Sequence, residues 1–220
     1  MTGPINRLLK ITFLLLVMLS TLQAQNQDNR ILKRTVELNL RASIWEAVHD
    51  LAEKGIPIGF EAREHWNVYT DTRVVLSGGT VEEILNSIVK QDASYRWEEV
   101  DGVINIYPVK DRFEKSASFL ATRLVPVTIY SSDDRATTVE KFSNLFVNAS
   151  HDGADAEIQF HSSIGRGHPL GSREKCSETI NIPATDDVKT ALNKITKCQP
   201  VAPLWKVTPT KDRKGIIVVF

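Results

Sequence analysis

Two short stretches of this sequence each predict a strand that runs into a capped amphipathic helix, and this repeated pattern constrains the fold more than any other feature. In residues 78–91, GGTVEEILNSIVKQ, Thr80 and Glu83 form a capping box, in which each side chain bonds the backbone amide of the other residue. Apolar residues then recur at helical spacing on one face: Val81, Ile84, Leu85 and Ile88. Residues 41–54, RASIWEAVHDLAEK, repeat the box and the apolar face with Ser43, Glu46, Ile44, Ala47, Val48 and Leu51. Helices of this kind must bury one face against another layer, so we expect a layered domain.

Strand patterns surround both helices. TVELNL at residues 35–40 alternates apolar and polar residues, and the strand patterns IPIGFE and RVVLS separate the two helices. After the second helix, SYRWEEV and VINIYP flank the pair Asp101-Gly102, which is typical of two-residue hairpin turns. The predicted order over residues 35–108 is therefore β-α-β-β-α-β-β.

The same order returns in the second half of the chain. Residues 109–121 are rich in charged and small residues, and we interpret them as a linker. Beyond them the strand patterns are TRLVPVTIY, AEIQFH, ETINIP, LWKVTP and GIIVVF, and the helical patterns are ATTVEKFSNLFVNA and DDVKTALNKITKC. The apolar face of the last helix matches that of residues 78–91 position for position: Val188, Ala191, Leu192 and Ile195.

These patterns predict an α+β fold with two small domains, each of β-α-β-β-α-β-β order and each with two helices packed against small sheets. The first domain spans residues 35–108 and the second residues 122–220. The second domain is either a degenerate duplicate of the first or a unit whose helices resemble it by chance, since the spacing of its elements differs.

The N-terminus predicts export. Arg7 and Lys10 precede the apolar run ITFLLLVMLSTL, whose length is that of a signal peptide, and Ala24 provides a small residue at the expected cleavage site. We expect residues 1–24 to be removed, and an uncleaved N-terminal anchor is the alternative. Removal lowers Lys+Arg from 27 to 25 against 27 Asp+Glu, a formal net charge of −2. This charge balance argues against nucleic-acid binding, which favours a basic face. We also expect a mature chain without a transmembrane segment.

The two cysteines are compatible with a disulfide in an oxidising compartment. Cys176 precedes the strand ETINIP, and Cys198 ends the helix that follows it. A helix that folds back on the preceding strand brings the two residues together, and closing this loop would stabilise the fold by about 3 kcal/mol. The alternative is a pair of buried thiols.

Residues 35–108 resemble the short N-terminal domain shared by secretins and TonB-dependent outer-membrane receptors. The resembling features are the first strand with its capped helix, the V-x-L-x-G-x-T-x-E-E-x-L run that ends at Leu85, the Y-R-W strand and the closing V-I-N-I strand. The resemblance implies two helices packed between two small sheets. It also implies a periplasmic module that contacts other proteins, either an inner-membrane regulator or secretion machinery, and that has no catalytic residues. In those families a channel or β-barrel follows, whereas here we expect the second α+β domain, which also resembles the later periplasmic repeats of secretins.

Enzymatic signatures are sparse. The sequence has no G-x-S-x-G, no phosphate-binding G-x-x-x-x-G-K-[ST] and no H-E-x-x-H. GRGHPLG at residues 165–171 is glycine-rich but is not followed by a helix start, so we interpret it as a loop. The sharpest alternative to a non-enzymatic protein is a metal site in the loop at 151–175, because imidazole and carboxylate groups that suit zinc cluster there: His151, Asp152, Asp155, His161 and His168.

Other residues have two interpretations each. Glu82-Glu83 and Glu98-Glu99 look like paired carboxylates, but they fit a helix N-terminus and a solvated strand edge better. The remaining features are isolated or common by chance: His49, His65 and the acceptor triplet Asn148-Ala149-Ser150. Trp45 and Trp66 form either a ligand-stacking pair or part of the edge of the fold.

We therefore expect an exported, non-enzymatic protein-protein interaction module, an adaptor or scaffold of a cell-envelope complex, located in the periplasm or secreted and peripheral to the outer membrane. We expect no cofactor, no metal and no nucleic acid. The partner is another envelope protein or peptide, bound by strand addition to an exposed sheet edge. The terminal GIIVVF is either that edge or an internal strand. The alternative function is a metal-dependent enzyme or small-ligand binder that uses the 151–175 loop.

Overall fold

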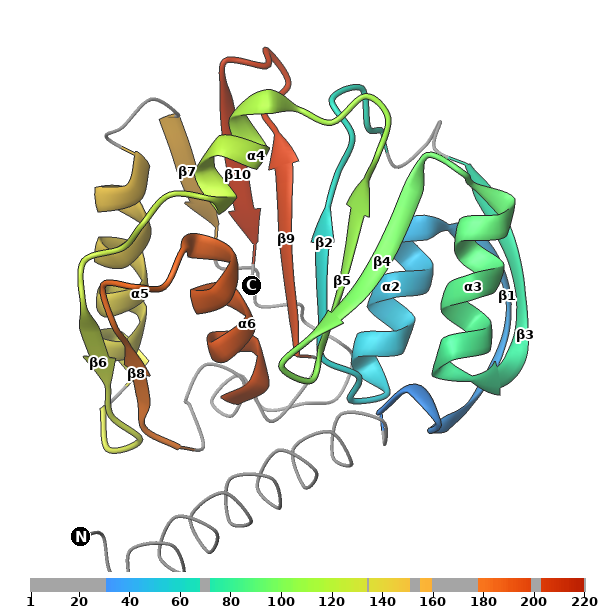
Figure 1. Ribbon diagram of the computed structural model, residues 1–220, viewed down its shortest axis with the longest axis horizontal. Helices are drawn as coiled ribbons and strands as arrows, with labels where there is room; N and C mark the ends of the chain where they lie inside the picture. The colour runs from blue at the N-terminus through green and yellow to red at the C-terminus, as the bar shows by residue number, and fades with distance from the viewer. Residues whose placement is uncertain are drawn as a thin grey trace, which may run out of the picture.

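The computed structural model describes residues 31–67, 72–133, 135–150, 155–159, 178–198 and 203–219. The predicted α+β class is confirmed (Figure 1). A first unit contains β1 (Thr35–Ser43), α2 (Ile44–Glu53), β2 (Ile58–Glu61), β3 (Arg73–Thr80), α3 (Val81–Gln91), β4 (Tyr95–Val100) and β5 (Val103–Pro108). A second unit contains β6 (Val127–Ile129), α5 (Arg135–Ser150), β7 (Asp155–Gln159), β8 (Ile180–Ile182), α6 (Val188–Cys198), β9 (Leu204–Pro209) and β10 (Gly215–Val219).

The caps that the sequence predicts set the starts of α2 and α3. The amide of Glu46 donates to Ser43 Oγ and the amide of Ser43 donates to Glu46 Oε2, and Thr80 and Glu83 exchange the same pair of bonds. The apolar face of each helix is buried, and Leu51 and Leu85 are both inaccessible to solvent. In the second unit α6 is capped differently, since Asp187 Oδ1 accepts from the amide of Thr190.

The two units have the same strand pairing and share one sheet. In the first unit β5 lies between antiparallel β4 and parallel β2, and in the second β10 lies between antiparallel β9 and parallel β7. Each unit also has a separate antiparallel pair, β1 with β3 and β6 with β8. Parallel pairing of β2 with β9 joins the two halves into a six-stranded sheet of order β4-β5-β2-β9-β10-β7, which Figure 1 shows through the centre of the molecule.

The two hydrophobic cores lie on opposite faces of this sheet. Alternate residues of β9 divide between them, because Leu204 belongs to the core of α2 and α3, whereas Trp205 and Val207 belong to the core of α6. Side chains of adjacent strand residues point to opposite faces, so the helices of the two units cover opposite sides. The second unit is therefore turned over relative to the first at the β2–β9 junction.

The expectation about the connecting segment needs correction, and the structure decides between the two alternatives left open for the terminal strand. Residues 109–121 are more than a linker, since they contain α4 (Glu114–Leu120), whose Phe119 and Leu120 are buried in the second core. The terminal strand β10 is internal, between β9 and β7, so it is not the exposed edge.

The predicted signal peptide, residues 1–24, lies outside the described residues. Among the residues that are described, no helix has the length and apolar character needed to cross a bilayer.

Candidate functional site

On one face of the sheet, the β2–β9 junction is closed by a tryptophan that lies against a glycine. Gly59 of β2 is the register partner of Trp205 of β9. A Cβ placed on Gly59 would lie 2.1 Å from Trp205 Cε2, so a glycine is required where the ring crosses the strand. Trp205 is 1% exposed, and its Nε1 donates to Oδ1 of Asn193 on α6 at 2.9 Å. The ring is therefore fixed by its own unit and covered by the other.

On the other face of the sheet, a lysine of the second unit enters an aromatic cluster of the first. Lys206 Nζ lies 4.2 Å from the ring centre of Trp45 and 4.1 Å from that of Trp66. The two tryptophans considered from the sequence as a stacking pair do face a common space, and this lysine occupies it. Burial lowers the pKa of Lys206 to about 8, while the two indole faces favour its charged form.

β4 repeats the tryptophan arrangement at the end of the sheet. Trp97 Nε1 donates to Oδ1 of Asn86 on α3 at 3.2 Å, as Trp205 does to Asn193. The two asparagines hold equivalent positions, each five residues after the first residue of its helix. Trp97 is only half-buried, and β4 is the terminal strand of the sheet in the described part of the chain. The two units thus present the same tryptophan edge in a covered and an uncovered form.

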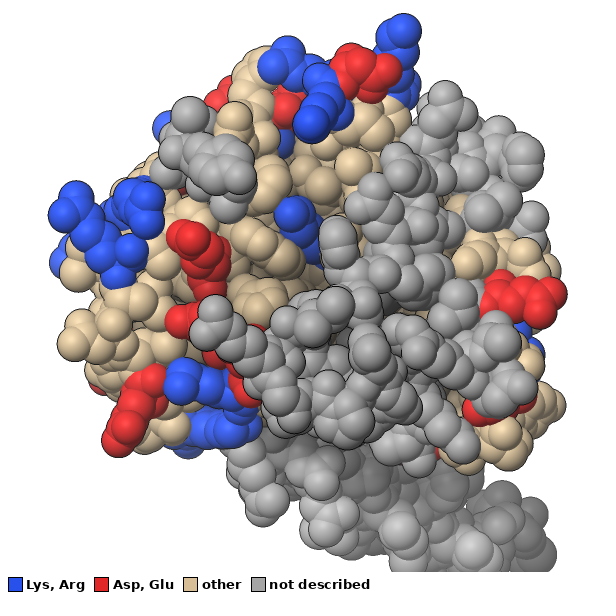
Figure 2. Space-filling model, turned by 180° about the vertical axis from the view of Figure 1, so that it is seen from behind, with Lys and Arg blue, Asp and Glu red and all other residues tan. Residues whose placement is uncertain are grey.

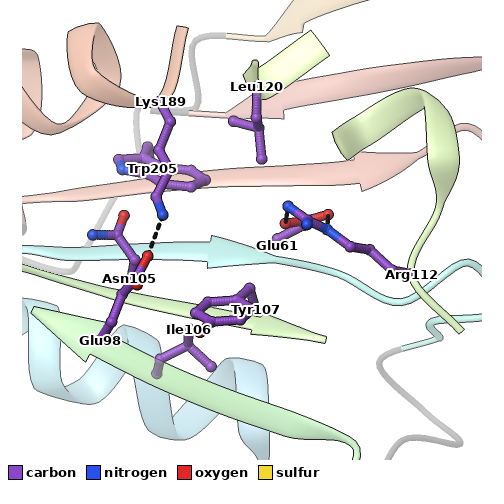
Figure 3. A pocket seen from close by; sticks show the side chains of 9 residues that line it. All are labelled: Glu61, Glu98, Asn105, Ile106, Tyr107, Arg112, Leu120, Lys189 and Trp205. Carbon is purple, nitrogen blue, oxygen red and sulfur yellow. Dashed lines mark hydrogen bonds and ion pairs between the residues drawn. The ribbon is translucent and has the colours of Figure 1, made fainter. Parts of the chain in front are cut away.

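A pocket of about 130 Å³ lies between the sheet of the first unit and the helices α4 and α6 of the second. Figure 3 shows Glu61 facing Arg112, and Lys189 reaching from α6 toward Glu98. Arg112 donates two hydrogen bonds of 2.8 Å to the Glu61 carboxylate, and Lys189 forms an ion pair with Glu98. Because these four charges are already paired, the pocket supports the contact between the units rather than offering a free charge to a ligand.

Burial and pairing act in opposite directions on the Glu61 carboxyl. Glu61 is 1% exposed, and desolvation raises its pKa, although the hydrogen bonds and the charge of Arg112 act to lower it. The same pairing raises the pKa of the Arg112 guanidinium. Asn105, on the neighbouring strand β5 and also buried, has an Oδ1 without a hydrogen-bond partner among the described residues.

Several residues singled out in the sequence have structural surroundings that do not form a reactive centre. The Glu83 carboxylate accepts the capping bond from Thr80 N, and the Glu98 carboxylate pairs with Lys189, so both carboxylates have structural partners. His49, with its neighbours Asp50 and Glu53 on α2, offers ligand atoms that lie within 4.8 Å of one another at the surface. His49 and Asp50 are half-buried and Glu53 is exposed, and acidic groups at a surface are common without an ion.

The proposed loop site and the disulfide fall largely on undescribed residues. Of the loop group, His151, Asp152, His161 and His168 lie outside the described residues, and Asp155 begins β7. Cys198 is 1% exposed at the end of α6, but Cys176 lies outside the described residues, so their pairing stays a prediction.

Charged side chains on the visible face are mixed in sign. Figure 2 shows acidic and basic residues close to one another over the described surface.

Sequence reasoning found both tryptophan strands but missed their asparagine partners, the glycine contact and Lys206. A signal for the asparagines was present, because a Leu-Asn pair stands in each of the two helices and a tryptophan follows it by 11 residues in one unit and by 12 in the other. The glycine and the lysine carry no such local signal.

Comparison of the chain with protein-family models, with curated proteins and with solved structures found no match.

Proposed function

We propose that this chain is an exported protein-protein interaction module, an adaptor or scaffold of a cell-envelope complex, which binds a partner by strand addition. The observation that supports this most directly is the β2–β9 junction. There a strand of one unit is added to the edge of another unit through the backbone, with Ile58 N donating to Pro203 O at 3.0 Å and Ala62 N to Val207 O at 2.8 Å. A sheet edge that is extended in this way within the chain is chemically suited to be extended by another protein.

At two outer strands of the first unit, backbone groups that a partner strand would use are already bound within the chain. At β3, the Gln91 side chain accepts from Val75 N at 2.8 Å and donates to Val75 O at 2.9 Å, which occupies the backbone groups that a partner would use. At β4, the terminal strand of the six-stranded sheet in the described chain, Tyr95 O accepts from Arg96 Nη1 at 2.9 Å and Tyr95 N donates to Asp92 O at 3.2 Å. Because β10 lies between β9 and β7, the terminal segment GIIVVF is not the edge offered for strand addition.

The resemblance of residues 35–108 to the short N-terminal domain of secretins and TonB-dependent receptors supports the location. In this proposal residues 1–24 direct the chain to the periplasm, where Cys176 and Cys198 form a disulfide. The work of the protein is recognition and not catalysis, which agrees with the paired state of the charges around Glu61 and Glu98.

Fractionation and cross-linking of intact cells test this proposal. We expect the chain in the periplasmic fraction, shortened by its first 24 residues, and cross-linked to a defined envelope protein. Metal analysis of the purified chain is the second measurement. Retention in the cytoplasm, or stoichiometric metal that is lost from a His161→Ala/His168→Ala variant, would contradict the proposal and favour the enzymatic alternative.

A further inference from the structure

We infer that the pocket between the two units binds one side of an uncharged sugar, with a ring hydroxyl that accepts from Lys189 Nζ and donates to Asn105 Oδ1. This inference goes beyond the proposed function and does not rest on it. Its basis is a buried acceptor that has no partner among the described residues, in a pocket whose charges cancel.

The acceptor is the side-chain oxygen of Asn105 on β5. The amide nitrogen of this side chain donates to Val103 O at 3.1 Å, which fixes the orientation of the amide group. Asn105 is 1% exposed, and its Oδ1 has no hydrogen-bond partner in the described part of the chain. Figure 3 shows the amide pointing toward Lys189 and the Trp205 ring, which also line the pocket. A buried acceptor without a partner is costly, so a ligand group that donates to it gains affinity.

The charges that line the pocket disfavour a charged ligand. Glu61 pairs with Arg112 and Glu98 pairs with Lys189, so two cations face two anions and an ionic ligand would have to break a pair. Donors nevertheless remain, because Arg112 binds Glu61 through Nε and Nη2, and its Nη1 makes no side-chain bond to another described residue. The pocket therefore fits a neutral group that both donates and accepts hydrogen bonds.

A hydroxyl group meets this requirement better than an amide or a carbonyl group. Its oxygen can donate one hydrogen bond and accept two. One hydroxyl between Lys189 and Asn105 can therefore accept from the ammonium group and donate to the amide oxygen. An amide divides these two functions between separate atoms, and a carbonyl oxygen only accepts.

The remaining walls of the pocket suit the C–H faces of a sugar ring. Figure 3 shows the two ion pairs at opposite ends of the pocket, with the rings of Trp205 and Tyr107 between them. Leu120 of α4 adds an aliphatic side chain. The volume of about 130 Å³ is close to that of a cavity of about 150 Å³ that holds benzene, so one side of a sugar ring fits. The side chains of Arg112 and Glu98 are 44% and 42% exposed, so the rest of the sugar can extend into solvent.

Titration of the full chain with neutral sugars tests this inference. The probes are glucose, galactose, mannose and N-acetylglucosamine at millimolar concentrations, and amide resonances of the 15N-labelled protein report the site of binding. We expect saturable shifts with at least one sugar, confined to β5, α4 and α6. Cyclohexanol is the control probe, because it has a ring of the same size with a single hydroxyl group, and it should bind at least tenfold more weakly.

Removal of the acceptor is the first variant. Asn105→Leu keeps the approximate size of the side chain but removes Oδ1, so the affinity for the sugar should fall at least tenfold. The matched control is the same exchange at Asn181, which is exposed on β8 and should leave the affinity unchanged.

Removal of the donor is the second variant, and it keeps the inference testable if Asn105→Leu does not fold. Lys189→Met should weaken sugar binding at least fivefold. Because this change also breaks an ion pair of α6, its control is Lys194→Met, which breaks the pair of Lys194 with Asp186 on the same helix. The control should bind the sugar as the unchanged chain does.

The inference is overturned if none of the four sugars shifts the resonances of the pocket, which would mean that only water binds there. Shifts outside the pocket, equal affinity for cyclohexanol, or sugar binding that survives both Asn105→Leu and Lys189→Met would overturn it as well. None of these measurements needs an envelope partner, so they decide the inference whether or not a cross-link to such a partner forms.

Discussion

Trp205 and Trp97 occupy equivalent places in two units of one chain, yet only one of them is in a core. Each ring donates to an asparagine at the same position of its helix, so the local structure is the same. What differs is the neighbour: β2 brings Gly59 over Trp205, and no described strand covers Trp97. The comparison teaches that the burial of this tryptophan is decided by strand addition from outside its unit.

The largest effect is expected for Gly59→Val, which tests whether the covering strand needs a glycine. The added atoms overlap the Trp205 ring, so the ring must leave its site. The free energy of unfolding should fall by about 5 kcal/mol, because the variant has both an overpacked strand and an unpacked tryptophan. Urea denaturation measures this loss. In a Trp205→Leu background the same substitution should cost less than half as much. Equal costs in both backgrounds would show that the loss does not come from overlap with the Trp205 ring.

The two tryptophans themselves give the next largest effect. Trp205→Ala removes a ring that is 1% exposed and should cost about 4 kcal/mol. Trp97→Ala removes a half-buried ring and should cost about 1.5 kcal/mol, because part of its surface already contacts water. Urea denaturation of the two variants side by side provides the difference. Similar losses would mean that the β4 edge is as well covered as the junction.

Lys206 makes the two units differ in how their stability depends on pH, because the residue of β4 that corresponds to this buried lysine is the half-exposed Glu98. Since burial lowers the pKa of Lys206 to about 8, from an ordinary value of 10.5, the unfolded chain retains this proton at pH values where the native protein has lost it. The free energy of unfolding should therefore rise with pH between about 8 and 10.5, by at most about 3 kcal/mol.

Removal of the lysine is the matched experiment. Lys206→Met fills the space between Trp45 and Trp66 without a charge, so its stability should lack this rise between pH 8 and 10.5. Below pH 8 the wild-type lysine is charged in both states and its burial carries the full cost, so the variant should be the more stable protein at pH 7. Chemical denaturation at several pH values measures both. A rise of unchanged size in the variant would show that another group titrates.

The smallest effect is expected for the two asparagines. Asn193→Ala leaves the buried Trp205 Nε1 without its acceptor and should cost about 2 kcal/mol, which is typical of a buried donor left unpaired. Asn86→Ala frees a ring nitrogen that water can reach at the open edge and should cost about 0.5 kcal/mol. Thermal unfolding of the two variants should rank them in this order, and the reverse ranking would contradict the exposure of Trp97.

How far the sequence predicts the fold can be judged from particular elements. The capping boxes and apolar faces of α2 and α3 are local signals, and all four cap bonds are present. The helix α4 was missed because its charged and small residues carry no clear helical pattern, and it is held by burying Phe119 and Leu120 against the second unit. Whether GIIVVF is an edge or an internal strand had no local answer, since it depends on where β7 lies.

The sequence by itself determined the elements of each unit, because caps, hydrophobic periodicity and turn pairs act within a few residues of one another. The tertiary structure alone decided how the units meet: which strands pair across the junction, that Gly59 lies under Trp205, and that Lys206 enters the space between Trp45 and Trp66. Those contacts join residues more than a hundred positions apart. Their energy comes from shape and desolvation at the place of meeting, which no local pattern encodes.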